Sequence, residues 1–282
     1  MWKQKLGMSA SGGFGVPAAE FVRLVGEAGF DAVSPEQCAE LPSMVEAARE
    51  CGLALQSLHA PFGRAAAMWD PDPAISEPAA EELIASLTDC ARYAIPVLVA
   101  HVWIGFDYTF DRDRLRFAQF DRVVREAERL GIRIAFENTE GEEYLFALME
   151  YFQGCETVGF CWDAGHEMCY NHSRDLLAMY GDRLLVTHLN DNLGISRYDG
   201  RTFWTDDLHL LPYDGIGDWE NNLCRLRASR PLAYLNFELT IHSKPHRHEN
   251  DGYAAMPLPV YLAEAYKRAC RIAVRYTRWK NA

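Results

Sequence analysis

The sequence predicts a (β/α)₈ barrel, or TIM barrel, as a single domain over residues 1–282. Two observations lead to this prediction: eight short apolar runs alternate with eight longer amphipathic segments, and six of the eight runs end on an acidic or histidine residue. A chain of 282 residues also has the length of one barrel, which takes roughly 250 residues. Because 49% of the residues are hydrophobic, the chain can fill a large core.

The apolar runs are expected to form parallel strands that helices cover on both faces, because each run is short and mostly apolar. They are residues 5–9, 32–35, 53–59, 97–101, 132–137, 158–163, 184–188 and 232–238. The segments between them repeat apolar residues near the 3.6-residue period of a helix. These expected helices are residues 17–28, 41–51, 77–93, 111–130, 143–152, 173–180, 219–228 and 256–276.

Several element boundaries carry signals of their own. Gly29, Gly52 and Gly131 each follow an expected helix and precede an expected strand, where glycine commonly caps a helix C-terminus. Pro17 is expected in the first turn of its helix, and Ser173 is expected to cap the N-terminus of another. Strict alternation of strand and helix then favours a closed parallel barrel.

An open, doubly wound sheet is the alternative fold. It would call for a glycine-rich phosphate loop after the first strand, and residues 11–15 are glycine-rich but match neither GxGxxG nor a P-loop. The longest irregular stretches, residues 62–75 and 192–218, both follow expected strands. In a barrel they would cover the C-terminal face, where catalytic loops lie.

Charge and composition argue against nucleic acid and membrane partners. The chain has 28 Lys and Arg against 40 Asp and Glu, a net charge of −12, whereas phosphate-backbone binding comes mainly from Lys and Arg. It has no run of 18 apolar residues, and its first six residues lack the apolar core of a signal peptide. Eight cysteines, none in a CxxC pair, are expected to be reduced and mostly buried. These features predict a cytoplasmic protein without a membrane span.

Residues of metal-ligand type stand at or just beyond the ends of the later strands. Parallel barrel strands bring their C-terminal ends to one mouth, so these side chains are expected to converge. Several buried carboxylates would repel one another without a cation, and a bound divalent metal removes that conflict. The nine candidate ligands are His59, His101, Glu137, Asp163, His166, His188, Asp207, His209 and Glu238.

The mixture of imidazoles and carboxylates narrows the metal. Such a site suits Zn or Mn, with Co, Fe and Mg as alternatives. One ion takes roughly four to six ligands, so nine candidates imply either more than one ion or residues that contact substrate instead.

Five ordered segments carry a family resemblance: residues 136–139 (FENT), 163–166 (DAGH), 188–192 (HLNDN), 207–212 (DLHLLP) and the strand that ends at Glu238. With these segments the chain resembles the xylose-isomerase-like barrel superfamily over about residues 5–275. That superfamily includes sugar phosphate isomerases and epimerases, ketose 3-epimerases, hydroxypyruvate isomerase, inosose dehydratase and the endonuclease IV group.

The resemblance to the isomerases and epimerases implies a catalytic arrangement. Glu137, Asp163, His188 and Glu238 would hold one divalent ion, and the two glutamates would also move a proton next to a carbonyl. His166 would contact a substrate oxygen as a third catalytic group. The chain departs from the ketose 3-epimerases where they carry an Arg shortly after the seventh-strand His, because that position is Gly194 here.

Two other members of the superfamily give alternatives. In the endonuclease IV group nine ligands hold three zinc ions, and all nine ligand types have a match in this chain, which implies a zinc phosphodiesterase acting on abasic DNA. An inosose-dehydratase-like lyase would use the same residues. A barrel that binds sugar without catalysis is a further hypothesis.

Substrate contacts are predicted around the same mouth. The predicted substrate-binding residues are His59, His101, Trp103 and Arg197, and the resemblance to the isomerases and epimerases implies Glu143 as a further substrate contact. Aromatic residues in the loops either line a pocket or pack the loops; they are Phe14, Trp69, Trp103 and Trp204. Residues 244–248 (KPHRH), Arg64 and Arg197 either receive a substrate phosphate or stay solvated. The expected partner is a small sugar-type molecule, and pairing of barrels through outer helices would give a homo-oligomer.

Overall fold

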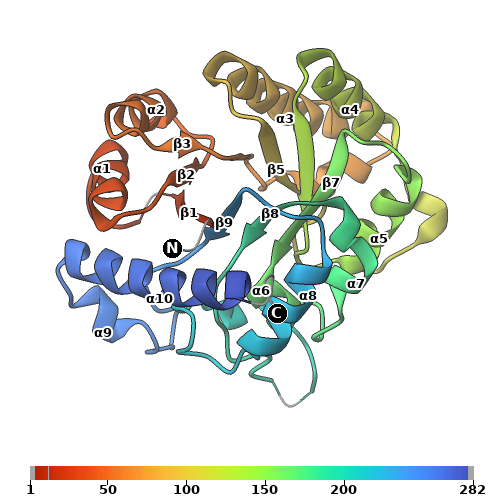
Figure 1. Cartoon of the computed structure of the whole chain (residues 1–282). Coiled ribbons are helices and arrows are strands. Elements are labelled where there is room, and N and C mark those ends of the chain that lie inside the picture. Colours follow the sequence, from red (N-terminus) through yellow and green to blue (C-terminus); the bar gives the residue numbers. More distant parts are fainter. Residues whose placement is uncertain (1–3, 12, 198, 279–282) are drawn as a thin grey trace.

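Parallel strands form the centre of the molecule, and helices surround them (Figure 1). The computed structural model describes residues 4–11, 13–197 and 199–278. Its strands are β1 (Lys5–Ala10), β2 (Ala32–Pro35), β3 (Ala54–Leu55), β4 (Leu58–His59), β5 (Val97–His101), β6 (Arg133–Glu137), β7 (Val158–Asp163), β8 (Leu184–His188) and β9 (Tyr234–Phe237). All of their pairings are parallel, and the predicted TIM barrel is confirmed.

The barrel wall consists of two sheets that meet at two junctions. Their strand orders are β3-β2-β1-β9 and β4-β5-β6-β7-β8. The expected strand over residues 53–59 is split because its first half pairs with β2 and its second half with β5. A bridge between Glu36 and His59 closes this junction, and one between Leu189 and Phe237 closes the other.

The helices follow the expected alternation. They are α1 (Ala18–Ala28), α2 (Leu41–Glu50), α3 (Pro73–Tyr93), α4 (Ala118–Leu130), α5 (Glu142–Tyr151), α6 (Ala164–Cys169), α7 (Leu176–Tyr180), α8 (Trp219–Ala228), α9 (Asp251–Ala254) and α10 (Leu258–Arg278). Gly29 and Gly131 are left-handed C-caps, with φ of 108° and 69°. Gly52, just past α2, also has a left-handed φ of 69°. The three glycine predictions are confirmed.

Several predicted helix starts are wrong. α3 begins at Pro73 because the Asp72 side chain accepts a hydrogen bond from the amide of Ala74. The helix expected from residue 111 begins at Ala118, since Asp111 caps only a 3₁₀ turn over Arg112–Arg114. Ser173 is not a cap.

The cap of α7 is Asp175, whose side chain accepts from the amide of Ala178 at 3.0 Å. Ser173 has a φ of 54° and precedes that helix. Pro17 is the N-cap residue of α1 and not part of its first turn.

The side chains alternate along each strand, so the polar residues at the strand ends lie above a buried apolar cluster. Val97, Val99, Ala135, Cys161 and Val186 belong to a small buried cluster separate from the main core. Because side chains alternate along a strand, the residues two positions further along share the faces of this cluster. They are His101, Glu137, Asp163 and His188. The strand pattern therefore brings these four side chains into one layer at the C-terminal mouth.

Among the described residues, no helix combines the length and the apolar character that crossing a membrane requires. All eight cysteines are free thiols, and three of them are buried.

Thiol labelling of the native protein should separate buried from exposed cysteines. Burial raises the pKa of Cys90 to about 12, so its reactive thiolate is scarce at neutral pH. Cys51 and Cys224 are exposed and should react first with a maleimide, as followed by peptide mass spectrometry. Cys90 should react only in denaturant, and rapid native labelling of Cys90 would contradict the core packing.

Candidate functional site

The structure brings all nine ligand-type residues together at the C-terminal mouth of the barrel. Six come from strand ends or the residue that follows a strand, one from α6, and two from the long loop after β8. They lie on both sheets, so the site depends on barrel closure. In order they are His59, His101, Glu137, Asp163, His166, His188, Asp207, His209 and Glu238.

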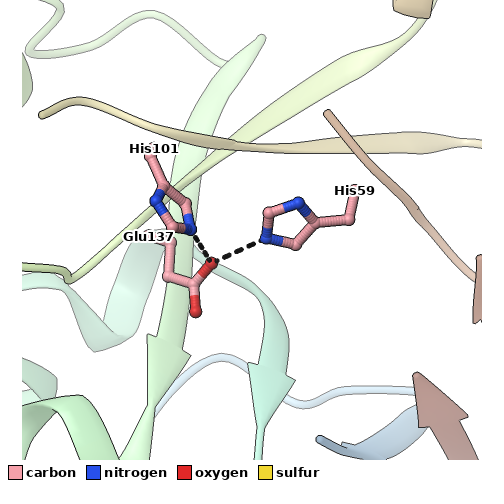
Figure 2. Close-up of side chains that lie close together, drawn as sticks. All are labelled: His59, His101 and Glu137. Carbon is pink, nitrogen blue, oxygen red and sulfur yellow. Dashed lines mark hydrogen bonds and ion pairs between the residues drawn. The ribbon is translucent and has the colours of Figure 1, made fainter. Parts of the chain in front are cut away.

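Glu137 lies at the centre of this set and is fully buried. One of its carboxylate oxygens, Oε2, lies 3.3 Å from Nε2 of His59 and 3.3 Å from Nε2 of His101 (Figure 2). The other oxygen, Oε1, lies 2.8 Å from Nδ1 of His188. The same His188 nitrogen lies 2.8 Å from Oε2 of Glu238. One imidazole therefore stands between the two glutamates.

The donor atoms fall into groups with the spacing of metal ligands. In each group the ligand atoms lie within 4.8 Å of one another. The groups are Glu137–Asp163–His188–Glu238, His59–His101–Glu137, Asp163–His166–His209 and Glu137–Cys161–His188. Mixed nitrogen and oxygen donors at this spacing fit Zn or Mn. The first group offers four ligands from four neighbouring strand ends, which is enough to hold one ion.

Without an ion, the acids and imidazoles of the site neutralise one another. Burial alone would raise the pKa of Glu137, but His188 and His101 hold the pKa of this carboxyl well below its usual value. Burial opposes protonation of His188, yet the neighbouring Cys161 and the carboxylates of Glu137 and Glu238 raise its pKa well above the usual value. Burial raises the pKa of Asp163. A metal ion that binds at this site therefore displaces protons from His188 and Asp163.

Asp163 is held in place by amide groups that charge patterns do not reveal. Its Oδ1 accepts from the backbone amide of His166 at 2.7 Å, so it caps α6. Both its carboxylate oxygens accept from the side-chain amide of Asn190, at 3.2 and 3.0 Å. Asn138 accepts from the backbone amide of Asp163 at 2.8 Å and donates to its carbonyl at 2.9 Å. Asn138 and Asn190, the third residues of FEN and HLN, are therefore positioning residues that were not predicted from the sequence.

His166 has a defined orientation. Its Nδ1 lies 3.0 Å from the carbonyl oxygen of Asn138, so this nitrogen carries a proton and donates it. Its Nε2 then faces Asp207, at 3.6 Å from Oδ1. Asp207 in turn lies 2.9 Å from Nε2 of His209. The loop after β8 thus completes the site with Asp207 and His209.

Asp191, which is fully buried, anchors the loop after β8 through hydrogen bonds. Its carboxylate accepts from the backbone amides of Tyr213 at 2.8 Å and Gly217 at 2.9 Å, and from the indole N–H of Trp219 at 2.8 Å. A backbone bridge also pairs Asp191 with Leu210. These bonds fix the segment that carries Asp207 and His209.

Gly165→Ala should disturb the site through Asn190. A Cβ at residue 165 would lie 1.9 Å from Oδ1 of Asn190, so the amide that holds Asp163 must move. We expect a loss of about 1–3 kcal/mol in the free energy of unfolding, together with weaker metal binding. Gly252→Ala, in α9 with nothing within 4 Å of the added Cβ, is the matched control. Equal stability of the two variants in urea titrations would contradict this packing.

A cavity of about 510 Å³ opens above the cluster, and we call it the main cavity. Eight of the nine candidates line it, and the exception is Asp163. Asp163 and the main-chain groups that hold it lie behind that wall. The other lining residues are Ser9, Ala10, Ser11, Ser34, Glu36, Ser57, Phe62, Ile104, Gly105, Phe106, Glu140, Tyr170, Trp204 and Lys244.

Several of these lining residues were not predicted from the sequence. Tyr170 stacks on His166 with ring centroids 4.9 Å apart, and Phe62 stacks on His101 at 4.6 Å. Phe106 comes from the irregular segment after β5, and its ring lies 5.4 Å from that of Tyr170. Their signal in the sequence was only an aromatic residue soon after a strand end, which also describes plain packing residues.

Three predicted substrate contacts lie outside the wall of the main cavity. Trp103 stacks on Tyr144 with centroids 4.0 Å apart and donates its indole N–H to the carbonyl of Gly105. Glu143 accepts from the hydroxyl of Tyr108 at 2.8 Å.

Arg197 forms an exposed ion pair with Asp199. Arg64 pairs with Glu82, while Phe14 and Trp69 are buried in the core. Among the residues considered as phosphate contacts, Lys244 lines the main cavity. Among the aromatic residues considered as pocket wall, Trp204 lines it.

Fold and site together define a TIM barrel with a buried cluster of metal-ligand type at its C-terminal mouth. The chain belongs to the xylose isomerase-like TIM barrel family, whose sequence profile matches residues 21–256. Over 171 residues it is 32% identical to the uncharacterized protein y4fM of Sinorhizobium fredii (strain NBRC 101917 / NGR234). That alignment covers 56% of this chain, and the chain spans about half the length of that relative, 51%.

Solved structures share the fold at low sequence identity. IolI protein with a bound zinc atom has a TM-score of 0.76 and 16% identity, with 98% of this chain and 100% of that chain covered. L-ribulose 3-epimerase has a TM-score of 0.75 and 12% identity, with 99% and 97% covered. The apo form of 3-keto-D-glucoside 4-epimerase, YcjR, from E. coli has a TM-score of 0.67 and 18% identity, with 95% and 100% covered.

Proposed function

We propose that this protein is a metal-dependent isomerase or epimerase that moves a proton next to the carbonyl of a small sugar, sugar phosphate or related polyol ketone. One observation carries the proposal: Glu137 and Glu238 both approach Nδ1 of His188 to 2.8 Å at the wall of the main cavity. Two carboxylates at one reaction chamber are what proton removal and return require.

The comparisons support this proposal. Two of the solved structures that share the fold are sugar epimerases by name, and a third carries zinc. Their identity to this chain, 12–18%, supports only a common fold. The choice of reaction therefore depends on the site.

The residues present assign distinct tasks. Glu137, Asp163, His188 and Glu238 would hold the divalent ion, which supplies positive charge that polarises a substrate carbonyl. Glu238 is the more open of the two glutamates, with 21% of its side chain exposed against 1% for Glu137. In this proposal Glu238 takes the proton from the carbon next to that carbonyl, and Glu137 returns one.

The other residues of the wall would orient the substrate and keep water out. The Nε2 of His166 faces the main cavity beside Asp207 and can bind a substrate hydroxyl. Phe62 and Tyr170 stack on the imidazoles and form apolar wall. A drier cavity strengthens each of these polar contacts.

Proton exchange with solvent tests the proposed reaction. Metal-loaded protein incubated in deuterated water with a panel of ketoses, aldoses and ketone-bearing glycosides should place deuterium next to the carbonyl of at least one of them, as seen by NMR or mass spectrometry. A lyase variant would give the same exchange followed by loss of water. No exchange across the panel, with metal content verified, would refute the proposal.

A second candidate function rests on a different observation. Three metal-ligand groups contain eight of the nine candidates, and Asp207, which lies 3.6 Å from Nε2 of His166, is the ninth. These nine residues are the full ligand set that the resemblance to endonuclease IV implies. An acidic chain with one lysine in the cavity wall favours sugar chemistry over DNA. Incision of a duplex with an abasic site at nanomolar protein would reverse this preference.

A further inference from the structure

A second chamber adjoins the main cavity beneath the loop that follows β9. It has a volume of about 380 Å³, and we call it the side chamber. The residues that line both spaces are Ser11, Trp204, Asp207, His209, Glu238 and Lys244. The residues that line only the side chamber are Leu239, Thr240, His242, Ser243 and Pro245. Each space is large enough for a small ring, and a substrate made of a single sugar ring would leave the side chamber unused.

Trp204 stands where the two chambers meet. Its side chain is 43% exposed, although it lines both spaces. The ammonium of Lys244 lies over its ring, 5.7 Å from the centroid. An indole that is held by a cation but left open to a cavity is a platform on which a planar or sugar ring can stack.

The charges of the side chamber favour an uncharged group over a phosphate. Lys244 is the one lysine or arginine among the described residues that line either chamber, and its ammonium already lies 3.4 Å from Oδ2 of Asp207. Asp207 and Glu238 line the same space, so a phosphate would meet two carboxylates. Arg247, in the nearby loop, is paired with Asp206 and Glu249.

The usual phosphate position of a barrel is also blocked by acids. Barrels often bind phosphate at loops after the last strands and at the N-terminus of a short extra helix. The short helix here is α9, and its first residue is Asp251. The Asp251 carboxylate accepts from the hydroxyl of Ser243 at 2.7 Å and contacts His248 at 2.8 Å. An anion at this position would be repelled.

We propose that the side chamber is a second subsite, which binds an uncharged ring attached to the reacting sugar and stacks it on Trp204. The substrate is then a glycoside, a sugar joined through its glycosidic oxygen to a second sugar or an aromatic group, and not a sugar phosphate. Because the glycosidic bond removes the carbonyl of the anomeric carbon, the reacting ring carries a ketone at another carbon. This inference rests on the proposed function for the reacting sugar. The second ring and its stacking on Trp204 are inferred from the two chambers alone.

Calorimetric titration of the metal-loaded protein tests the subsite without turnover. The probes are methyl β-glycosides, phenyl β-glycosides and β-linked disaccharides of glucose, galactose and xylose, with glucose 6-phosphate as the charged probe. A phenyl glycoside or disaccharide should bind about tenfold or more tightly than the methyl glycoside of the same sugar, since ring stacking on an aromatic side chain contributes on this scale. Whether the phenyl or the disaccharide series shows the larger gain identifies the natural second group.

Two variants make the test specific. Trp204→Ala should remove the gain and leave all probes near the affinity of the methyl glycoside. Phe203→Ala is the matched control, because Phe203 is equally exposed, at 44%, and lines neither chamber. No ring-dependent gain in any series, an equal loss in both variants, or tightest binding of glucose 6-phosphate would each overturn the subsite.

The outcomes separate this proposal from the proposed function. Trp204-dependent binding without any deuterium exchange on ketone-bearing glycosides would keep the subsite and remove the reaction. Exchange on free ketoses that Trp204→Ala leaves unchanged, with no ring-dependent gain, would keep the reaction and remove the subsite.

Discussion

Glu238→Gln should lower the rate of deuterium exchange by about 10²- to 10⁴-fold, the range that a positioned general base contributes. Glutamine keeps the size of the side chain but cannot take a proton. The Oε1 of the glutamine could still accept a hydrogen bond from Nδ1 of His188, which contacts both glutamates in the unmodified protein. The fold should therefore persist. Glu137→Gln should have at least as large an effect, because that carboxylate contacts three imidazoles.

The measurement must separate the loss of a general base from the loss of a metal ligand. Metal content is determined by elemental analysis for each variant, and exchange is expressed per bound ion. Glu126→Gln, on the outer face of α4 and paired with Arg129, is the control for a glutamate that has no part in the site. Unchanged exchange per bound ion in Glu238→Gln would remove that residue from proton transfer.

Removal of metal should abolish exchange and also lower thermal stability. The four proposed ligands follow β6, β7, β8 and β9, so an ion among them ties both sheets together. At a free ion concentration roughly 1,000-fold above Kd, binding adds about 4 kcal/mol to the free energy of unfolding. For a chain of this size that corresponds to a rise in Tm on the order of 10 °C.

Protons compete with the metal ion for the ligand atoms, so the stabilisation by metal should depend on pH. The pKa of His188 is raised in the absence of metal, because Cys161 and the carboxylates of Glu137 and Glu238 outweigh the effect of burial. Burial raises the pKa of Asp163. Both groups must be deprotonated to bind an ion, so metal affinity should fall as the pH is lowered. Differential scanning fluorimetry with and without chelator, across pH, measures both effects. A Tm that chelation leaves unchanged at every pH would show that no ion is held there.

The barrel and the nine candidate ligands could be predicted from the sequence because both follow from local patterns. Eight apolar runs fix the strands, and the alternation along each strand fixes which side chains share a face, as for Val99 and His101. Even the split strand at residues 54–59 was found as one run, since the change of partner from β2 to β5 leaves no mark on its apolar character.

The rest of the site depends on tertiary contacts. The sequence could not show that Asn138 and Asn190 hold Asp163, because an amide after a strand end resembles any loop residue until its partner is known. Trp103 was predicted at the pocket because it follows His101, but its ring is taken by Tyr144. The side chamber forms where two loops distant in sequence meet at Trp204 and Lys244.

The central claim is that Glu137, Asp163, His188 and Glu238 hold one catalytic divalent ion. Anomalous diffraction from a crystal of zinc-loaded protein tests it most directly. The account predicts the strongest anomalous peak among these four side chains, at about 2.0–2.2 Å from their nitrogen and oxygen ligand atoms. Three peaks of equal strength, with all nine residues as ligands, would favour the phosphodiesterase. Zinc bound elsewhere, with no peak among the four residues, would contradict the claim.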